Sequence, residues 1–232
     1  MNSSSIKNRG THIIDKAKAF GACLAGIVNA EELGRSPSYE IKGSDERLLK
    51  NRAVLIFALV HERSEPSLDW WDGKKGTPGN NRLINIGEML IHELQKEFKL
   101  KAQHLPYHVE KGGVFLKDAA ALAGIGVIGK SNLLITSDFG PRVRLRALLI
   151  DAPLSSSKSL EFDPCEVCSM PCIQACPQKA FAQGAFRRPS CNVQMKKNES
   201  KAEMVEQMGI RESFIRIIKY CRACELVCPV GK

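Results

Sequence analysis

The sequence predicts a three-layer α/β domain at residues 1–154 and a smaller cysteine-rich domain at residues 160–232. Helix-like and strand-like stretches alternate through the first 160 residues, and eight of the nine cysteines lie between Cys165 and Cys228. Alternating helices and strands pack most simply as helices on both faces of one sheet. The composition changes after a serine-rich stretch at residues 155–159, so we place the domain boundary there.

Hydrophobic periodicity predicts the elements of the first domain. Apolar residues at helical spacing predict three helices, at residues 6–20, 82–99 and 114–123. Strand-like runs predict five strands, at residues 22–28, 53–60, 103–109, 133–136 and 143–150. A loop at residues 61–81 carries Trp70 and Trp71, and such long loops in compact domains are often functional.

Composition and charge exclude several classes of protein. The chain of 232 residues is 44% hydrophobic and 25% charged, as in ordinary soluble proteins. Its longest apolar run, residues 53–60, is far shorter than the roughly 20 residues that span a bilayer, and its polar start lacks a secretory core. We therefore expect a cytoplasmic protein without membrane contact. The basic residues behind the net charge of +9 fit either a solvated face or an anionic partner.

Cysteine spacing predicts two 4Fe–4S clusters. The motifs are Cys165-x2-Cys168-x3-Cys172-x3-Cys176-Pro177 and Cys221-x2-Cys224-x3-Cys228-Pro229, with Cys191 between them. In two-cluster ferredoxins, the last cysteine of a motif, followed by proline, binds the other cluster. This rule assigns one cluster to Cys165, Cys168, Cys172 and Cys228. The second cluster takes Cys176, Cys221 and Cys224, and Cys191 completes its set of four.

Structural zinc is the alternative role for these cysteines, because four thiolates also bind zinc. Zinc motifs do not require the crossed Cys-Pro pattern, which occurs twice here. One departure from the usual spacing is the three residues between Cys168 and Cys172, where two are common. Cys23 lies apart in an apolar pattern and is expected to be a buried small side chain.

The glycine-rich stretch Gly124-Ile-Gly-Val-Ile-Gly129-Lys130-Ser131 matches the residue spacing of dinucleotide-binding and phosphate-loop motifs, but not their structural context. Those patterns bind phosphate when a strand precedes the glycines and a helix follows them. Here a predicted helix comes first and a predicted strand follows. A phosphate-loop ATPase is therefore the least favoured function, and the glycines are expected to permit a tight turn and a close backbone approach.

The glycine stretch and the cysteines together resemble the epoxyqueuosine reductase family, iron–sulfur enzymes related to the cobalamin-dependent reductive dehalogenases. The similar segments are residues 109–117, 123–135, 139–140 and 143–154, both cysteine motifs, and Arg187-Arg-Pro-Ser-Cys191. The resemblance implies an N-terminal domain of the cobalamin-binding, nitroreductase-related type and a ferredoxin-like module that feeds electrons to a corrinoid.

The resemblance also implies particular site residues. Residues of the glycine segment would line the corrinoid, namely Gly129, Lys130, Ser131 and Leu134, with Leu145 on the following strand. A catalytic Asp of the family, taken to donate a proton, falls on Glu110. Glu is one methylene longer, and it serves as a general acid if burial raises its pKa.

Partners follow from the same resemblance. Relatives that act on tRNA carry a helical-repeat extension after the second cysteine motif, whereas this chain stops at Lys232. A small molecule or a modified nucleoside is therefore a possible substrate, and epoxyqueuosine in tRNA becomes only one candidate. We also expect a low-potential electron donor such as ferredoxin or flavodoxin. Two functions remain open: a corrinoid-dependent iron–sulfur reductase, and a non-catalytic electron carrier or activator of a separate corrinoid protein.

The ligand assignment predicts the effect of one substitution. Cys191→Ala should remove one cluster and leave about four irons per chain instead of about eight. Iron analysis of anaerobically purified protein measures this directly, and Cys23→Ala is the matched control that keeps the full iron content. An undiminished iron content in Cys191→Ala would show that Cys191 is not a ligand.

Overall fold

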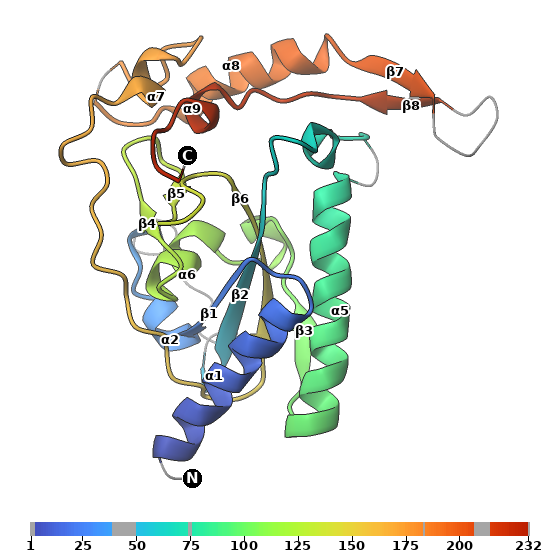
Figure 1. Cartoon of the computed structure of the whole chain (residues 1–232), viewed down its shortest axis with the longest axis vertical. Helices are drawn as coiled ribbons and strands as arrows, with labels where there is room; N and C mark the ends of the chain where they lie inside the picture. Colours follow the sequence, from blue (N-terminus) through green and yellow to red (C-terminus); the bar gives the residue numbers. More distant parts are fainter. Residues whose placement is uncertain (1–2, 39–49, 74–75, 183, 207–213, 232) are drawn as a thin grey trace.

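A four-stranded antiparallel sheet forms the centre of the molecule in the computed structural model (Figure 1). The structure describes residues 3–38, 50–73, 76–182, 184–206 and 214–231. The strand order is β1-β2-β6-β3, and all three pairings are antiparallel. The strands are β1 (Leu24–Asn29), β2 (Ala53–Val60), β6 (Val143–Ile150) and β3 (Ala102–His104).

The apolar run of β2 explains why this strand is central. Successive side chains of a strand face opposite sides of the sheet, so a strand covered on both sides is apolar throughout. Val54 and Ile56 belong to the core on one face of the sheet, and Leu55 and Phe57 belong to the core on the other. β2 is therefore buried on both faces, as its sequence predicts.

Two long helices cover one face of the sheet. They are α1 (Ser3–Ala19) and α5 (Pro78–Phe98). α5 starts where Thr77 caps it, because the Thr77 hydroxyl accepts a hydrogen bond from the Asn80 amide at 3.2 Å and Pro78 occupies the first turn. The loop predicted at residues 61–81 therefore ends earlier, at Thr77, because α5 begins at Pro78. It also contains a short 3-10 helix, η1 (Pro66–Asp69).

Shorter elements cover the opposite face. They are α2 (Ala30–Leu33), α6 (Leu116–Leu122) and the hairpin of β4 (Val127–Ile128) and β5 (Leu134–Ile135). Asp118 of α6 is buried and joins α6 to the chain after α2, since its carboxylate accepts from the Ser36 hydroxyl and the Ser38 amide. Helices on both faces of one sheet confirm the predicted α/β layering.

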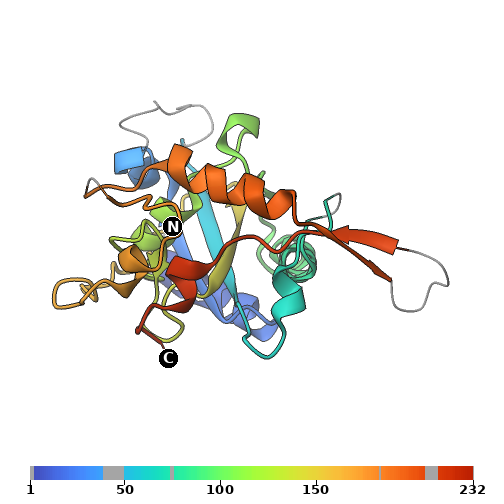
Figure 2. The same ribbon diagram turned by 90° about the horizontal axis from the view of Figure 1, so that it is seen from above.

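The cysteine-rich part lies across one end of the sheet (Figure 1). Its elements are α7 (Pro171–Gln174), α8 (Arg188–Glu199), β7 (Glu203–Glu206), β8 (Phe214–Ile217) and α9 (Ala223–Leu226). Figure 2 shows α8 crossing above the sheet, with the β7–β8 ribbon extending away from the body. The predicted domain boundaries and the ferredoxin-like character of this part stay predictions.

The serine-rich stretch that marks the predicted boundary runs along the free edge of the sheet. The backbone amides of Ile27 and Asn29 in β1 donate to the hydroxyls of Ser157 and Ser156, at 3.1 and 2.8 Å. The Ser157 amide donates to the Ile27 carbonyl at 2.8 Å. This stretch thus covers the edge of β1, which would otherwise present unpaired backbone groups.

Three predicted strands are longer in the sequence pattern than in the structure. The strand predicted at residues 103–109 is only β3, because Pro106 has no amide hydrogen to donate to a ladder. The strand predicted at 22–28 begins at Leu24, and the one predicted at 133–136 is β5. Within the described part of the chain, no helix is both long and apolar enough to cross a membrane.

The packing of β1 against the end of α6 predicts one effect on stability. A Cβ at Gly26 would lie 2.4 Å from the Ala123 carbonyl oxygen, so Gly26→Ala should reduce the free energy of unfolding by about 1–3 kcal/mol. Gly10→Ala in α1 is the control, because its Cβ would find ordinary contact at 3.7 Å from Ile27. Thermal unfolding of both variants tests this, and equal melting temperatures would contradict it.

Candidate functional site

The eight clustered thiols fall into two groups in space. All nine cysteines carry free thiols. The Cys172 thiol interacts electrostatically with those of Cys228, Cys165 and Cys168. The Cys224 thiol interacts with those of Cys221, Cys191 and Cys176. These are the two sets of four that the crossed Cys-Pro rule assigns, and we name them the first and the second thiol set.

Burial raises the pKa of three of these thiols. Burial, with the neighbouring thiols, raises the pKa of Cys172 and of Cys191. The same causes raise the pKa of Cys224 to about 11. Because metal ligands are thiolates, a metal or cluster bound here must displace the protons, and its assembly is favoured by higher pH.

The loop of the first motif accommodates its extra residue through one backbone conformation. Met170 has φ 54° and ψ 52°, the left-handed conformation, immediately before Pro171 starts α7. This turn brings Cys172 into α7 after Cys168, despite the three intervening residues. Two backbone amides also point at sulfur: Met170 donates to Cys168 Sγ at 3.4 Å, and Ala180 donates to Cys176 Sγ at 3.3 Å. Such donors stabilise thiolates that bind iron.

A cavity of about 180 Å³ lies at the second thiol set. All four thiols of the set line it, and so do residues of the β4–β5 turn, Ser131, Asn132 and Leu133. Lys117, Arg188 and Arg222 are also in its wall. On the other side of the same turn, a Cβ at Gly129 would lie 3.2 Å from Cys165 Sγ. The β4–β5 turn therefore lies between the two thiol sets.

The glycine-rich stretch forms a hairpin turn and not a phosphate loop. The Gly129 amide donates to the Leu133 carbonyl at 2.9 Å, and Asn132 has φ 57°. β4 and β5 pair antiparallel on either side, so no helix begins after Ser131. A phosphate would find no helix N-terminus at this turn. The turn instead gives the backbone its close approach to Cys165.

The five residues expected to contact a corrinoid lie in the β4–β5 hairpin and in β6. Leu134 and Leu145 are buried in the core, with 4% and 8% of their surface exposed. Gly129 packs on Cys165, Ser131 is buried and Lys130 is exposed. The cavity beside them is smaller than the about 300–1,000 Å³ of ordinary small-molecule sites, and a corrinoid is a large ligand. The role of these five residues as corrinoid contacts stays a prediction.

Glu110 lies in a short 3-10 helix, η2 (Val109–Lys111), at the surface. Its side chain is 69% exposed, and its carboxylate lies 3.6 Å from His108 Nδ1. Burial, the condition under which Glu110 would serve as a general acid, is not met in this conformation. The catalytic role of Glu110 stays a prediction.

A buried ionic network joins the α/β domain to the second cysteine motif. The Asp69 side chain, only 6% exposed, contacts Arg144 of β6 and Arg222, which lies between Cys221 and Cys224. His61 Nδ1 lies 2.7 Å from the same carboxylate. Burial alone would raise the pKa of Asp69, but His61 and the two guanidinium groups hold it below its usual value. Asp69 is therefore a fixed negative charge under the motif.

Further contacts fasten the segment around the second motif. Trp71 and Ile218 exchange two backbone hydrogen bonds, at 3.0 and 2.8 Å. The Lys219 ammonium lies 4.6 Å from the centre of the Trp70 ring. The Arg63 guanidinium donates to the Leu226 carbonyl at 3.4 Å. The loop with Trp70 and Trp71 thus holds the segment around the second cysteine motif against the α/β domain. The sequence analysis did not predict that this loop holds the second cysteine motif. Arg222, a charged residue inside that motif, was the one signal that the motif has a partner elsewhere in the chain.

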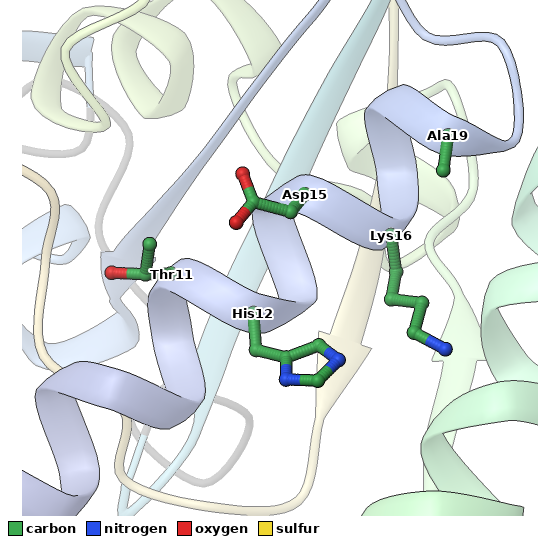
Figure 3. A pocket seen from close by; sticks show the side chains of 5 residues that line it. All are labelled: Thr11, His12, Asp15, Lys16 and Ala19. Carbon is green, nitrogen blue, oxygen red and sulfur yellow. The ribbon is translucent and has the colours of Figure 1, made fainter.

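Figure 3 shows a second depression, on the surface of α1. Its volume is about 440 Å³, and it is lined by Thr11, His12, Asp15, Lys16 and Ala19. The side chains spread around the helix instead of converging (Figure 3), and Lys16 pairs with Glu93 and Glu97 of α5. Figure 1 places α1 away from α7 and α9, the helices of the cysteine motifs. This depression has no connection with the thiol sets.

Comparison with known proteins supports the resemblance seen in the sequence. No protein-family model matches the chain. An epoxyqueuosine reductase of Lactococcus garvieae is 23% identical over 94% of the chain, and one of Yersinia pestis is 32% identical over 90%. The chain has homologues named epoxyqueuosine reductase. The chain spans 64% and 49% of the length of these two proteins. A tetrachloroethene reductive dehalogenase of Sulfurospirillum multivorans is 31% identical over 49% of the chain.

Solved structures show the same relationship in the fold. The epoxyqueuosine reductase of Bacillus subtilis has a TM-score of 0.67 and 19% identity, over 98% of this chain and 66% of its own length. A reductive dehalogenase linked to B12-dependent dehalogenation has a TM-score of 0.51 and 18% identity, over 72% of this chain and 25% of its own. The predicted resemblance to epoxyqueuosine reductases is confirmed, and the fold is theirs.

The Asp69 network predicts a large effect of removing its charge. Asp69→Asn leaves Arg144 and Arg222 without their shared counter-charge, so the free energy of unfolding should fall by about 3 kcal/mol. The folded-state pKa of Asp69 is lowered, so its contribution is complete above the ordinary value of 3.8 and is lost as pH falls through the folded value. The full difference from the wild type is thus expected at pH 7.

Thermal unfolding and limited proteolysis of residues 218–231 measure this effect. Glu65→Gln is the control. Glu65 lies in the same loop as Asp69, but its ion pair with Arg82 of α5 is exposed to solvent. Equal stability of the Asp69→Asn protein and this control at pH 7 would show that the network does not hold the segment.

Proposed function

We propose that the chain is an iron–sulfur oxidoreductase with two 4Fe–4S clusters in a ferredoxin-like module. The first cluster would be bound by Cys165, Cys168, Cys172 and Cys228, and the second by Cys176, Cys191, Cys221 and Cys224. The observation that carries this proposal is the separation of eight thiols into two sets of four, each set drawing on both cysteine motifs. Relatives named as reductases support the redox function.

Structural zinc is the alternative occupant of these thiols. A zinc ion with Zn–S bonds of about 2.3 Å would draw its four sulfurs to within about 4 Å of one another. In the described part of the chain, no three His, Cys, Asp or Glu side chains gather closely enough to hold one metal ion. The crossed Cys-Pro pattern, which zinc motifs do not require, is what favours clusters over zinc.

The two sets suggest a direction for electron flow. Val167, between Cys165 and Cys168, is 95% exposed, so the first cluster is open to a donor protein such as ferredoxin or flavodoxin. The second set lines the cavity under the β4–β5 turn. Electrons would enter at the first cluster, pass to the second, and leave at the cavity. Two one-electron steps then supply a two-electron reduction.

A corrinoid is the electron acceptor that the resemblance implies, and it would supply a strongly reducing metal to the substrate. Its proposed contacts remain the residues that the resemblance implies, of which Ser131 lines the cavity of the second thiol set. A solved relative from Bacillus subtilis has a catalytic aspartate on a loop that has swung out of its active site. The exposed position of Glu110 is compatible with such a loop, and Glu110 remains the candidate proton donor.

The substrate class that we favour is a modified nucleoside, by analogy with the named activity of the relatives. One solved epoxyqueuosine reductase holds an epoxyqueuosine-modified tRNA stem loop. Exposed basic residues of α8, among them Lys196 and Lys197, offer this chain a surface for an anionic partner. Epoxyqueuosine in tRNA stays only one candidate substrate.

A non-catalytic electron carrier is the second candidate function. The exposed Glu110 and the buried positions of Leu134 and Leu145 favour it, because a carrier needs neither a proton donor nor a corrinoid site. The carrier would use the same two clusters and pass electrons to a separate corrinoid protein.

One experiment tests the proposal and separates these two functions. The full chain, purified anaerobically, should show two dithionite-reducible clusters by EPR spectroscopy. If the chain is the reductase, it should bind one cobalamin per chain, and binding should change the visible spectrum of the cobalamin. Unchanged cobalamin beside two reducible clusters would favour the carrier. Absence of reducible clusters would contradict both functions. Cys191→Ala, with only the first cluster, is the control for the contribution of the second.

A further inference from the structure

Lys117 is a partly buried cation at the cavity of the second thiol set. It belongs to α6, in the α/β domain, and it lines the same cavity as Cys176, Cys191, Cys221 and Cys224. Its ammonium donates to the Asn132 carbonyl at 2.5 Å. The carbonyl of the β4–β5 turn thus holds the charge in place at the cavity that the four thiols line.

Lys117 forms no ion pair within the described part of the chain, although the nearby charge of Asp118 acts to raise its pKa. Asp118, its neighbour in the chain, is hydrogen-bonded to Ser36 and Ser38. The other buried cation of the cavity is different, because Arg222 is paired with Asp69 and Glu225.

A second cation adds to the charge of the cavity. Arg188 of α8 lines it as well, and burial together with Arg188 lowers the pKa of Lys117. Two cations beside one cavity repel each other and lose hydration, so the arrangement is costly unless an anion lies between them. A 4Fe–4S cluster on four thiolates is such an anion, with a charge of about −2 when oxidised.

We propose that Lys117 raises the reduction potential of the second cluster, so that this cluster collects the electrons that pass through the module. The inference rests on the proposed function. Each cluster takes one electron from a low-potential iron–sulfur or flavin donor, which adds one negative charge. The Lys117 ammonium, held by its hydrogen bond to the β4–β5 turn, stabilises the more negative reduced cluster more than the oxidised cluster. Lys117 is therefore a positioning residue of the electron path, supplied by the α/β domain.

The test is a redox titration of Lys117→Gln, followed by EPR spectroscopy. Reduction of the second cluster should become about tenfold less favourable, a fall of about 59 mV for a one-electron couple. The first cluster should keep its potential. Its signal is identified in Cys191→Ala, which lacks the second cluster. Lys117→Arg should restore the wild-type potential, because it keeps the charge.

Lys197→Gln is the matched control, since it removes the same charge from an exposed position on α8. Unchanged potentials in a Lys117→Gln protein that holds both clusters would overturn the inference and leave the proposed function intact. Equal falls for both clusters would overturn it too. If Lys117→Gln fails to hold the second cluster, Lys117→Met, which removes the charge but keeps the length of the side chain, decides: a fall confined to the second cluster upholds the inference, and no fall overturns it. A wild-type chain without clusters would contradict the inference and the proposed function together.

Discussion

Each cysteine motif supplies one thiol to the set that the other motif mainly forms, and the rest of the structure depends on this crossing. Cys176 belongs to the first motif but lies with Cys221 and Cys224, and Cys228 belongs to the second motif but lies with Cys172. Neither set is complete unless the two segments, separated by α8 and the β7–β8 ribbon, are held together. The α/β domain supplies part of what holds them.

The sheet provides this support at one of its ends. β6 carries Arg144, which contacts Asp69 and, through it, Arg222 of the second motif. The chain after β2 adds the backbone pair of Trp71 and Ile218. On the opposite face of the sheet, the β4–β5 turn lies between the thiol sets. The two cysteine motifs are thus fixed by residues from distant parts of the sequence, which limits how far the two thiol sets can move relative to each other.

Much of the fold could be predicted from the sequence because its signals are local. The apolar runs of β2 and β6 give both strands their observed bounds, and the amphipathic pattern places α5 to within a few residues. The short helices α2, α7 and α9 were missed, since four residues are too few for periodicity to show. The antiparallel order of the sheet was not predicted either, because strand order depends on contacts between distant residues.

The candidate site shows the same division. The grouping of the thiols follows from a spacing rule, and the spacing is local. The roles of Asp69 and Lys117 depend on which residues meet in space, and neither lies in a recognisable motif. Leu134 and Leu145 illustrate the limit of resemblance, because positions matched by a motif are buried in the core of this chain.

The most direct test of the account is the determination of iron, zinc and acid-labile sulfide in the same sample of anaerobically purified wild-type protein. The account predicts about eight irons and about eight sulfides per chain, with no stoichiometric zinc. Zinc at one or two ions per chain, without sulfide, would contradict it, because the thiols would then hold a structural metal and no path for electrons would exist.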